Sequence, residues 1–238
     1  MTGKSRSRHT LQVLALAANE TPEAAAESLC ALYAPAEAAG RPGVPNTASG
    51  PLDAQFTVQE LQSALRRCRK KSAAGPDGVP YQALTNLTEV AQDALVKWFN
   101  AIWNSGDVPN EWKKAMVVPL LKAGKPPGKA ESYRPVSLTS CISKLFERMV
   151  QARICWYLEE HHSLPNCMTG FRRGLAAQDS ILDLTSDIED NKNRRRNTIA
   201  VFLDVERAYD SVPLPTHLKF LHPYSCKWLV LWLTPLFV

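Results

Sequence analysis

The chain has 238 residues, of which 45% are hydrophobic and 21% are charged. A chain of this size and composition can bury a sizeable core in one large or two small domains, which excludes a protein disordered throughout. The formal net charge is +5, and the Lys and Arg residues stand in separate clusters of the kind that contact phosphate backbones. For any single cluster, a solvated face or a loop end is the alternative interpretation.

Six cysteines form neither a C-x-x-C pair nor a zinc-type spacing with the five histidines. This usage favours buried thiols in a reducing compartment, so we expect an intracellular protein of the nucleus or the cytoplasm. The apolar stretch 228–238 contains Pro235 and is shorter than the ~20 helical residues that cross a bilayer. We therefore expect no membrane role.

The first 55 residues are predicted to form one helix and a linker. Thr21 is a candidate N-cap and Pro22 a first helical residue, which predicts a helix from there to about residue 33. Residues 35–55 are rich in Pro, Gly, Ala and Ser, a composition typical of linkers. We interpret region 1–55 as this helix and linker, and the part before the linker as the remnant of a connection to an upstream module.

Region 56–114 is predicted to be helical. Thr57-Val-Gln-Glu60 is a capping box that opens a helix reaching about residue 72, and the apolar period of 88–104 indicates a second helix. Gly75-Pro-Asp-Gly78 between them is a tight turn by composition. Asp77 is therefore interpreted as a turn residue rather than as a chemical group.

Two extended segments, 115–121 and 133–138, flank a stretch rich in Lys, Gly and Pro and predict a β-hairpin with a long basic tip. Two helices are predicted after it, the second over residues 176–190. Their inward-facing residues are expected to be Ile142, Leu145, Phe146, Met149, Val150 and Arg153 in the first helix and Ile181, Leu184 and Ile188 in the second.

The apolar run 199–203 is rich in β-forming residues and short enough to be a buried strand. Asp204 would then emerge at the strand end, where a carboxylate suits Mg²⁺ and triphosphate chemistry. Glu206 lies on the same side if the extended conformation continues, so a paired-carboxylate site is one possibility. The sequence contains no Asp or Glu after Asp210, so no second carboxylate pair follows.

Five segments, taken in order, resemble the reverse transcriptase of non-LTR retrotransposons. They are 70–80, 112–125, 132–138, Gly170-Phe-Arg-Arg-Gly174 with Gln178, and the block that begins at Asp204. Any one of them is a weak signal, but five in the family's order and approximate spacing are hard to reach by chance. The resemblance covers residues 64–212.

The resemblance implies an α+β fold that comprises the fingers and the N-terminal part of the palm of a right-hand polymerase, incomplete. The fingers and palm would occupy 115–212, followed by a diverged tail over 213–238. The implied activity is RNA-directed DNA polymerisation with Mg²⁺ on an RNA template and a DNA primer, from deoxynucleoside triphosphates.

The resemblance also assigns roles to single residues. Asp204 would be the catalytic metal ligand, Val205 would offer its carbonyl to the metal and the nucleotide, and Glu206 would be a bystander. Tyr209 would be the steric gate that excludes a ribose 2′-hydroxyl, with core packing as the alternative. Asp210 is expected to be structural.

Lys122 and Arg134, on the two arms of the hairpin, resemble the residues that bind the triphosphate, with an ordinary basic loop as the alternative. Arg172 lies in a segment that resembles a template-contacting turn. The family's Asp-Asp block, thumb and endonuclease are not recognisable, so we expect this chain to be inactive alone. The rival interpretations are a non-catalytic nucleic-acid-binding remnant and a pseudogene-derived product.

Overall fold

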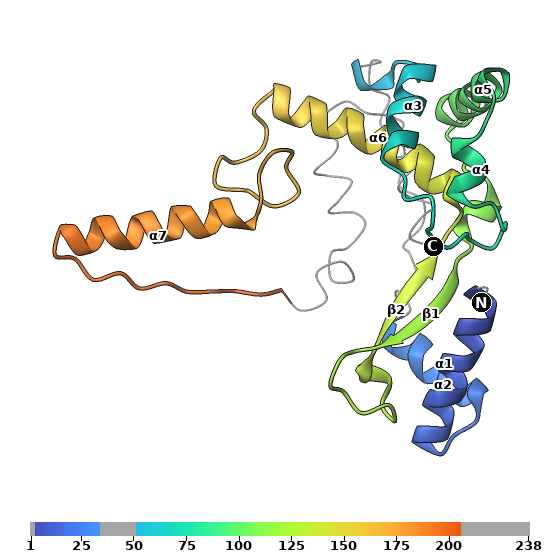
Figure 1. Cartoon of the computed structure of the whole chain (residues 1–238), viewed down its shortest axis with the longest axis horizontal. Helices are drawn as coiled ribbons and strands as arrows, with labels where there is room; N and C mark the ends of the chain where they lie inside the picture. The colour runs from blue at the N-terminus through green and yellow to red at the C-terminus, as the bar shows by residue number, and fades with distance from the viewer. Residues whose placement is uncertain (1–2, 34–50, 206–238) are drawn as a thin grey trace. The chain divides into compact units, whose positions relative to one another are not determined.

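The computed structural model describes residues 3–33 and 51–205, and it combines helices with one small sheet (Figure 1). The described residues fall into two compact units, one up to residue 150 and one from residue 151 onward. The helices of the first unit are α1 (Gly3–Ala18), α2 (Pro22–Tyr33), α3 (Val58–Arg66), α4 (Tyr81–Thr85) and α5 (Glu89–Ser105), and its strands are β1 (Met116–Leu121) and β2 (Tyr133–Leu138). Helix α6 (Cys141–Glu160) begins in the first unit and ends in the second, which also contains α7 (Ala177–Asn193).

An aromatic cluster forms the core of the first unit. Phe146 of α6 is fully buried, and its ring lies 5.0 Å from Phe99 of α5 and 5.5 Å from Phe56, between ring centroids. Trp103 adjoins the cluster, and its indole N–H donates to the carbonyl oxygen of Asp53 at 3.4 Å. Because Leu52 and Asp53 are buried, the end of the predicted linker packs against the core at these two residues.

Helix α3 begins as predicted but ends earlier. Thr57 and Glu60 form the reciprocal capping box, and the helix ends at Arg66 rather than near residue 72. Two features coincide with this end. The basic side chains that follow repel one another at helical spacing, and the Arg67 carbonyl accepts a hydrogen bond from the Arg148 guanidinium at 3.1 Å.

The turn Gly75–Gly78 is confirmed and lies against the start of α6. Gly78 adopts a φ of 70° and its N–H donates to the Gly75 carbonyl at 3.1 Å. The Asp77 carboxylate accepts from the Val79 N–H at 3.1 Å, which confirms its role as a turn residue. A Cβ on Gly75 would lie 2.4 Å from the Thr139 carbonyl oxygen, so only glycine allows this close approach.

The hairpin and the long helices follow the prediction. Strands β1 and β2 pair antiparallel, with Leu120 opposite Arg134 and Leu121 opposite Tyr133. Helix α5 begins at the Thr88 cap and ends at Gly106, whose φ is 73°. The inward side of α6 is confirmed for Leu145, Phe146, Met149 and Val150, which are all buried.

The N-terminal region forms two helices rather than one. The predicted helix is confirmed as α2, and the Thr21 hydroxyl accepts from the Ala24 N–H at 3.2 Å. Helix α1 was missed because its first turn contains no acidic residue, which is the opposite of what the helix dipole favours. Both helices pack on the hairpin or on the loop that joins its strands.

The second unit has the predicted helix but little buried surface. Helix α7 is present, yet the expected inward residues Ile181 and Ile188 are 62% and 42% exposed. The predicted strand over 199–203 is wrong, because this segment has no strand structure and its apolar side chains lie in solvent. A strand forms only beside a partner, and the part of the chain that the structure describes contains no strand that pairs with this one.

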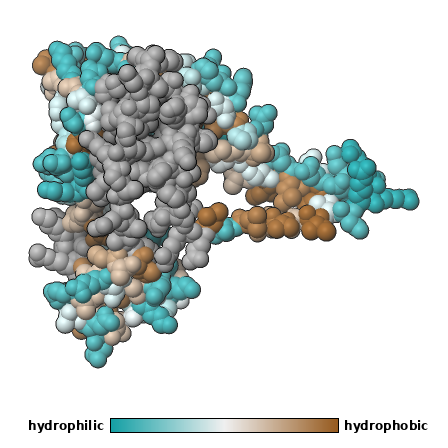
Figure 2. All heavy atoms as spheres, turned by 180° about the vertical axis from the view of Figure 1, so that it is seen from behind, coloured by the Kyte–Doolittle hydropathy of each residue, from teal (hydrophilic) through white to brown (hydrophobic). Residues whose placement is uncertain are grey.

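Figure 2 shows apolar side chains gathered along the uncovered surface of the second unit.

The prediction of buried cysteines holds only in part. Cys141 is buried, but Cys30, Cys155 and Cys167 are exposed, since the last two lie in the unit that buries little. Within the described ranges, no helix is both long enough and apolar enough to cross a membrane.

Candidate nucleotide and nucleic-acid interface

Lys122 and Arg134 lie on one face of the hairpin. Arg134 stands opposite Leu120, and Lys122 follows Leu120 by two residues, with its N–H donating to the Ser132 carbonyl at 2.8 Å. Because side chains alternate along a strand, the two cations share a face and Tyr133 points to the other one. Diagonal neighbours of this kind are about 7–8 Å apart, so one phosphate chain can contact both.

The two cations differ in their surroundings. Arg134 is exposed, whereas Lys122 is half-buried and its ammonium group donates to the Glu131 carbonyl at 2.7 Å. Lys125 is exposed in the loop beyond Lys122. The arrangement offers a guanidinium fork that can bind phosphate bidentately, together with a compact ammonium charge that a carbonyl holds in place.

Arg172 is bound within the second unit. Its guanidinium donates to both carboxylate oxygens of Glu159, at 2.9 Å and 2.6 Å, and to the carbonyls of Pro165 and Met168. The hydrogen bonds from Arg172 hold the pKa of Glu159 below its ordinary value. The side chain thus connects the end of α6 to the turn that follows it, and contact with a template stays a prediction.

The residues on either side of Arg172 project into solvent. Phe171 is 92% exposed and has a φ of 61°, a left-handed backbone that a bulky residue rarely adopts. Arg173 is also exposed. Sequence reasoning missed both the anchoring of Arg172 and the exposure of Phe171, because the partner Glu159 is thirteen residues away and no local pattern connects the two.

Asp204 is exposed in the segment that lacks strand structure, and Val205 is 66% exposed. Among the described residues, no group of three or more His, Cys, Asp and Glu side chains could hold a metal ion. Asp204 is a suitable oxygen ligand, but the described residues do not fit a complete metal site. Glu206, Tyr209 and Asp210 lie outside the described residues.

Residues 121–238 match the family described as reverse transcriptase (RNA-dependent DNA polymerase). The chain is also similar to three curated proteins of Drosophila melanogaster. The probable RNA-directed DNA polymerase from transposon BS is 34% identical over 155 residues, which is 65% of this chain and 17% of that protein. The probable RNA-directed DNA polymerase from transposon X-element is 30% identical over 66% of this chain and 17% of the relative.

The third relative is the RNA-directed DNA polymerase from mobile element jockey, with 27% identity over 68% of this chain and 18% of the relative. The chain therefore spans less than a fifth of the length of each of these relatives. Both hairpin cations and the turn around Arg172 lie inside the segment that matches the family. The chain belongs, through residues 121–238, to the reverse transcriptase family of transposable elements.

Proposed function

We propose that this chain provides the nucleotide-binding fingers and the start of the palm of a right-hand, RNA-directed DNA polymerase. The observation that carries the proposal is the shared face of Lys122 and Arg134, which lies within the family-matched segment. Two cations at this spacing suit a triphosphate, because Arg pairs with two phosphate oxygens while Lys adds a point charge. The substrates would be deoxynucleoside triphosphates.

The proposal extends to the metal and the sugar. Reverse transcriptases generally use divalent metal ions, and Mg²⁺ is the ion that carboxylate and carbonyl oxygens suit best here. Asp204 and the Val205 carbonyl would be its ligands, and Mg²⁺ would supply charge neutralisation of the phosphates. Tyr209 would exclude the ribose 2′-hydroxyl. These roles rest on the family resemblance.

The nucleic-acid contact would be the turn around Arg172, which would face an RNA template paired with a DNA primer. With Arg172 bound to Glu159, the exposed Arg173 is the cation left to meet a phosphate, and Phe171 offers an aromatic face on which an unpaired base can stack. Arg172 would then act by holding the turn in shape.

The test is a titration of the chain with a fluorescent deoxynucleoside triphosphate. We expect the double variant Lys122→Ala, Arg134→Ala to weaken nucleotide binding by at least about tenfold, since each charge-assisted contact to phosphate contributes on the order of 1.5–3 kcal/mol. Binding of a single-stranded RNA should fall much less.

The matched control is Lys125→Ala, Lys129→Ala, which removes the same charge from the exposed part of the same loop. Equal losses from the two double variants would mean that net charge alone binds the nucleotide, and the proposed site would be abandoned.

A second candidate is a chain that binds nucleic acid without catalysis. It is favoured by the exposed cations Arg134 and Arg173, which can contact phosphates without a metal ion. Both candidate functions predict that the chain binds RNA. Only a catalytic polymerase domain would extend a primer.

A further inference from the structure

The helical pair formed by α1 and α2 packs on the hairpin face opposite to the two cations. Leu14 and Ala15 of α1 and Ala25 of α2 form a buried cluster with Tyr133, and Leu29 lies against it. Tyr133 is 1% exposed, and burial raises the pKa of its phenol. The pair therefore covers the side of the hairpin on which Tyr133 lies, while Arg134 on the other face is exposed.

The same helices also contact the basic loop. The Tyr133 hydroxyl donates to the Pro127 carbonyl at 2.9 Å, which fixes the far arm of the loop to the anchored ring. Gly128 approaches α1 so closely that a Cβ on it would lie 2.7 Å from the Ala17 carbonyl oxygen. Both contacts act on residues between Lys122 and β2.

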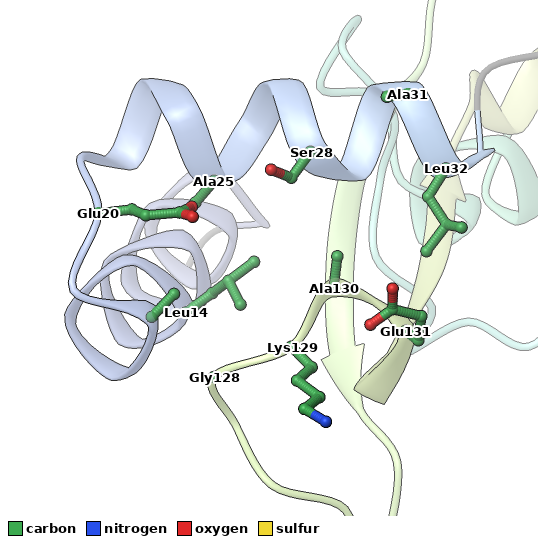
Figure 3. A pocket seen from close by; sticks show the side chains of 11 residues that line it. Leu14, Glu20, Ala25, Ser28, Ala31, Leu32, Gly128, Lys129, Ala130 and Glu131 are labelled. Atoms are coloured by element: carbon green, nitrogen blue, oxygen red, sulfur yellow. The ribbon is translucent and has the colours of Figure 1, made fainter.

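Figure 3 shows how far this contact extends. Leu14 of α1, Ala25, Ser28 and Leu32 of α2, and the loop residues from Gly128 to Glu131 line a pocket of about 770 Å³. Helix α1 approaches the loop at Gly128, and α2 contacts residues 130–132 beyond it. The two helices therefore support the loop at more than one place.

We propose that the α1–α2 pair is an intramolecular brace that positions the basic loop, with Tyr133 as the positioning residue that connects them. A two-stranded hairpin alone is marginally stable, and its connecting loop loses conformational entropy when it is ordered. Anchoring Tyr133 and Gly128 fixes the arm that carries Glu131, whose carbonyl holds the Lys122 ammonium group. The effect on nucleotide binding rests on the proposed function, whereas the effect on the loop does not.

The test compares two leucines of α1 in the full chain. Leu14 is 2% exposed against Tyr133, and Leu16 is 81% exposed on the same helix. We expect Leu14→Asn to speed amide hydrogen exchange in residues 122–132 about tenfold and to weaken binding of a deoxynucleoside triphosphate several-fold. Leu16→Asn should change neither quantity, and exchange in α5 should stay the same in both variants.

A second pair of variants tests the loop contact directly. Gly128→Ala places a methyl group against backbone, whereas Gly170→Ala meets nothing within 4 Å. Only the first should speed exchange in the loop. If the exchange in residues 122–132 is unchanged by both Leu14→Asn and Gly128→Ala, the brace is refuted. Faster loop exchange in a chain that binds no nucleotide at all would support the brace and reject the proposed nucleotide site.

Discussion

At the scale of single residues, the pair Glu159 and Arg172 controls the turn after α6. We expect Arg172→Gln to raise the rate of proteolysis in residues 161–175 by a few-fold to about tenfold, because it removes a bidentate, charge-assisted contact. Arg173→Gln is the matched control, since it removes the same charge from the neighbouring exposed residue. Limited proteolysis followed by mass spectrometry measures both rates.

The pH dependence of this turn has a definite sign. The pKa of Glu159 is lowered in the folded chain by its hydrogen bonds to Arg172, so the stabilisation is fully present above the ordinary glutamate pKa of about 4.3. It is lost as the pH falls through the lowered pKa. A turn equally protected in Arg172→Gln and in the unchanged chain at neutral pH would contradict the role given to this pair.

This pair also shows what sequence cannot predict at the residue scale. Asp77 was assigned correctly because its hydrogen bond reaches only two residues along the chain, and turn chemistry is local. Arg172 was assigned from its neighbours in sequence, yet its partner is supplied by the end of a helix. Lys122 and Arg134 are an intermediate case, because the hairpin was predictable but their shared face required the strand register.

At the scale of elements, the packing of α6 depends on one ring. Phe146 touches the rings of Phe56, Phe99, Trp103 and Trp112. We expect Phe146→Ala to lower the free energy of unfolding by about 3–5 kcal/mol, because it leaves a cavity in the aromatic cluster. Chemical denaturation monitored by tryptophan fluorescence measures the change.

The control for this prediction is Trp156→Ala on the same helix. Trp156 is 58% exposed, so its removal should change the unfolding free energy by only about 0.5 kcal/mol. Similar losses from the two variants would show that α6 is held by something other than the aromatic cluster.

The elements that were predicted correctly are determined by residues only a few positions apart in the sequence. The capping box at Thr57, the glycine stop at Gly106 and the alternation of the hairpin are of this kind. The early end of α3 coincides with a hydrogen bond from Arg148, 81 residues away in the sequence, and the missing strand at 199–203 lacks a described partner. A strand is a property of a sheet, so its apolar composition is necessary but not sufficient.

At the scale of the whole molecule, the 238-residue chain should bind RNA weakly and with strong salt dependence. The logarithm of the binding constant should fall linearly with the logarithm of the salt concentration, by about 0.7 for each phosphate that a Lys or Arg neutralises on a single strand. Fluorescence anisotropy at several salt concentrations measures the slope. Lys122→Ala, Arg134→Ala should leave most of this slope in place.

The same chain should not extend a primer with Mg²⁺ or Mn²⁺. Two-metal phosphoryl transfer needs carboxylates from more than one side, and Asp204 is exposed in a segment that pairs with no described strand. Asp204→Asn should leave RNA binding unchanged. Template-dependent incorporation of a labelled deoxynucleotide that Asp204→Asn abolishes would show that this expectation is wrong.

The uncovered segment 199–203 also governs how this chain behaves in concentrated solution. Its sequence, Ile-Ala-Val-Phe-Leu, contains no charge and no proline, and its apolar side chains are exposed. An exposed apolar stretch of this kind can pair with a second chain, so we expect it to nucleate intermolecular β-structure. The isolated chain will therefore lose soluble material as its concentration rises, and a single Lys placed in this stretch would act as a gatekeeper against that loss.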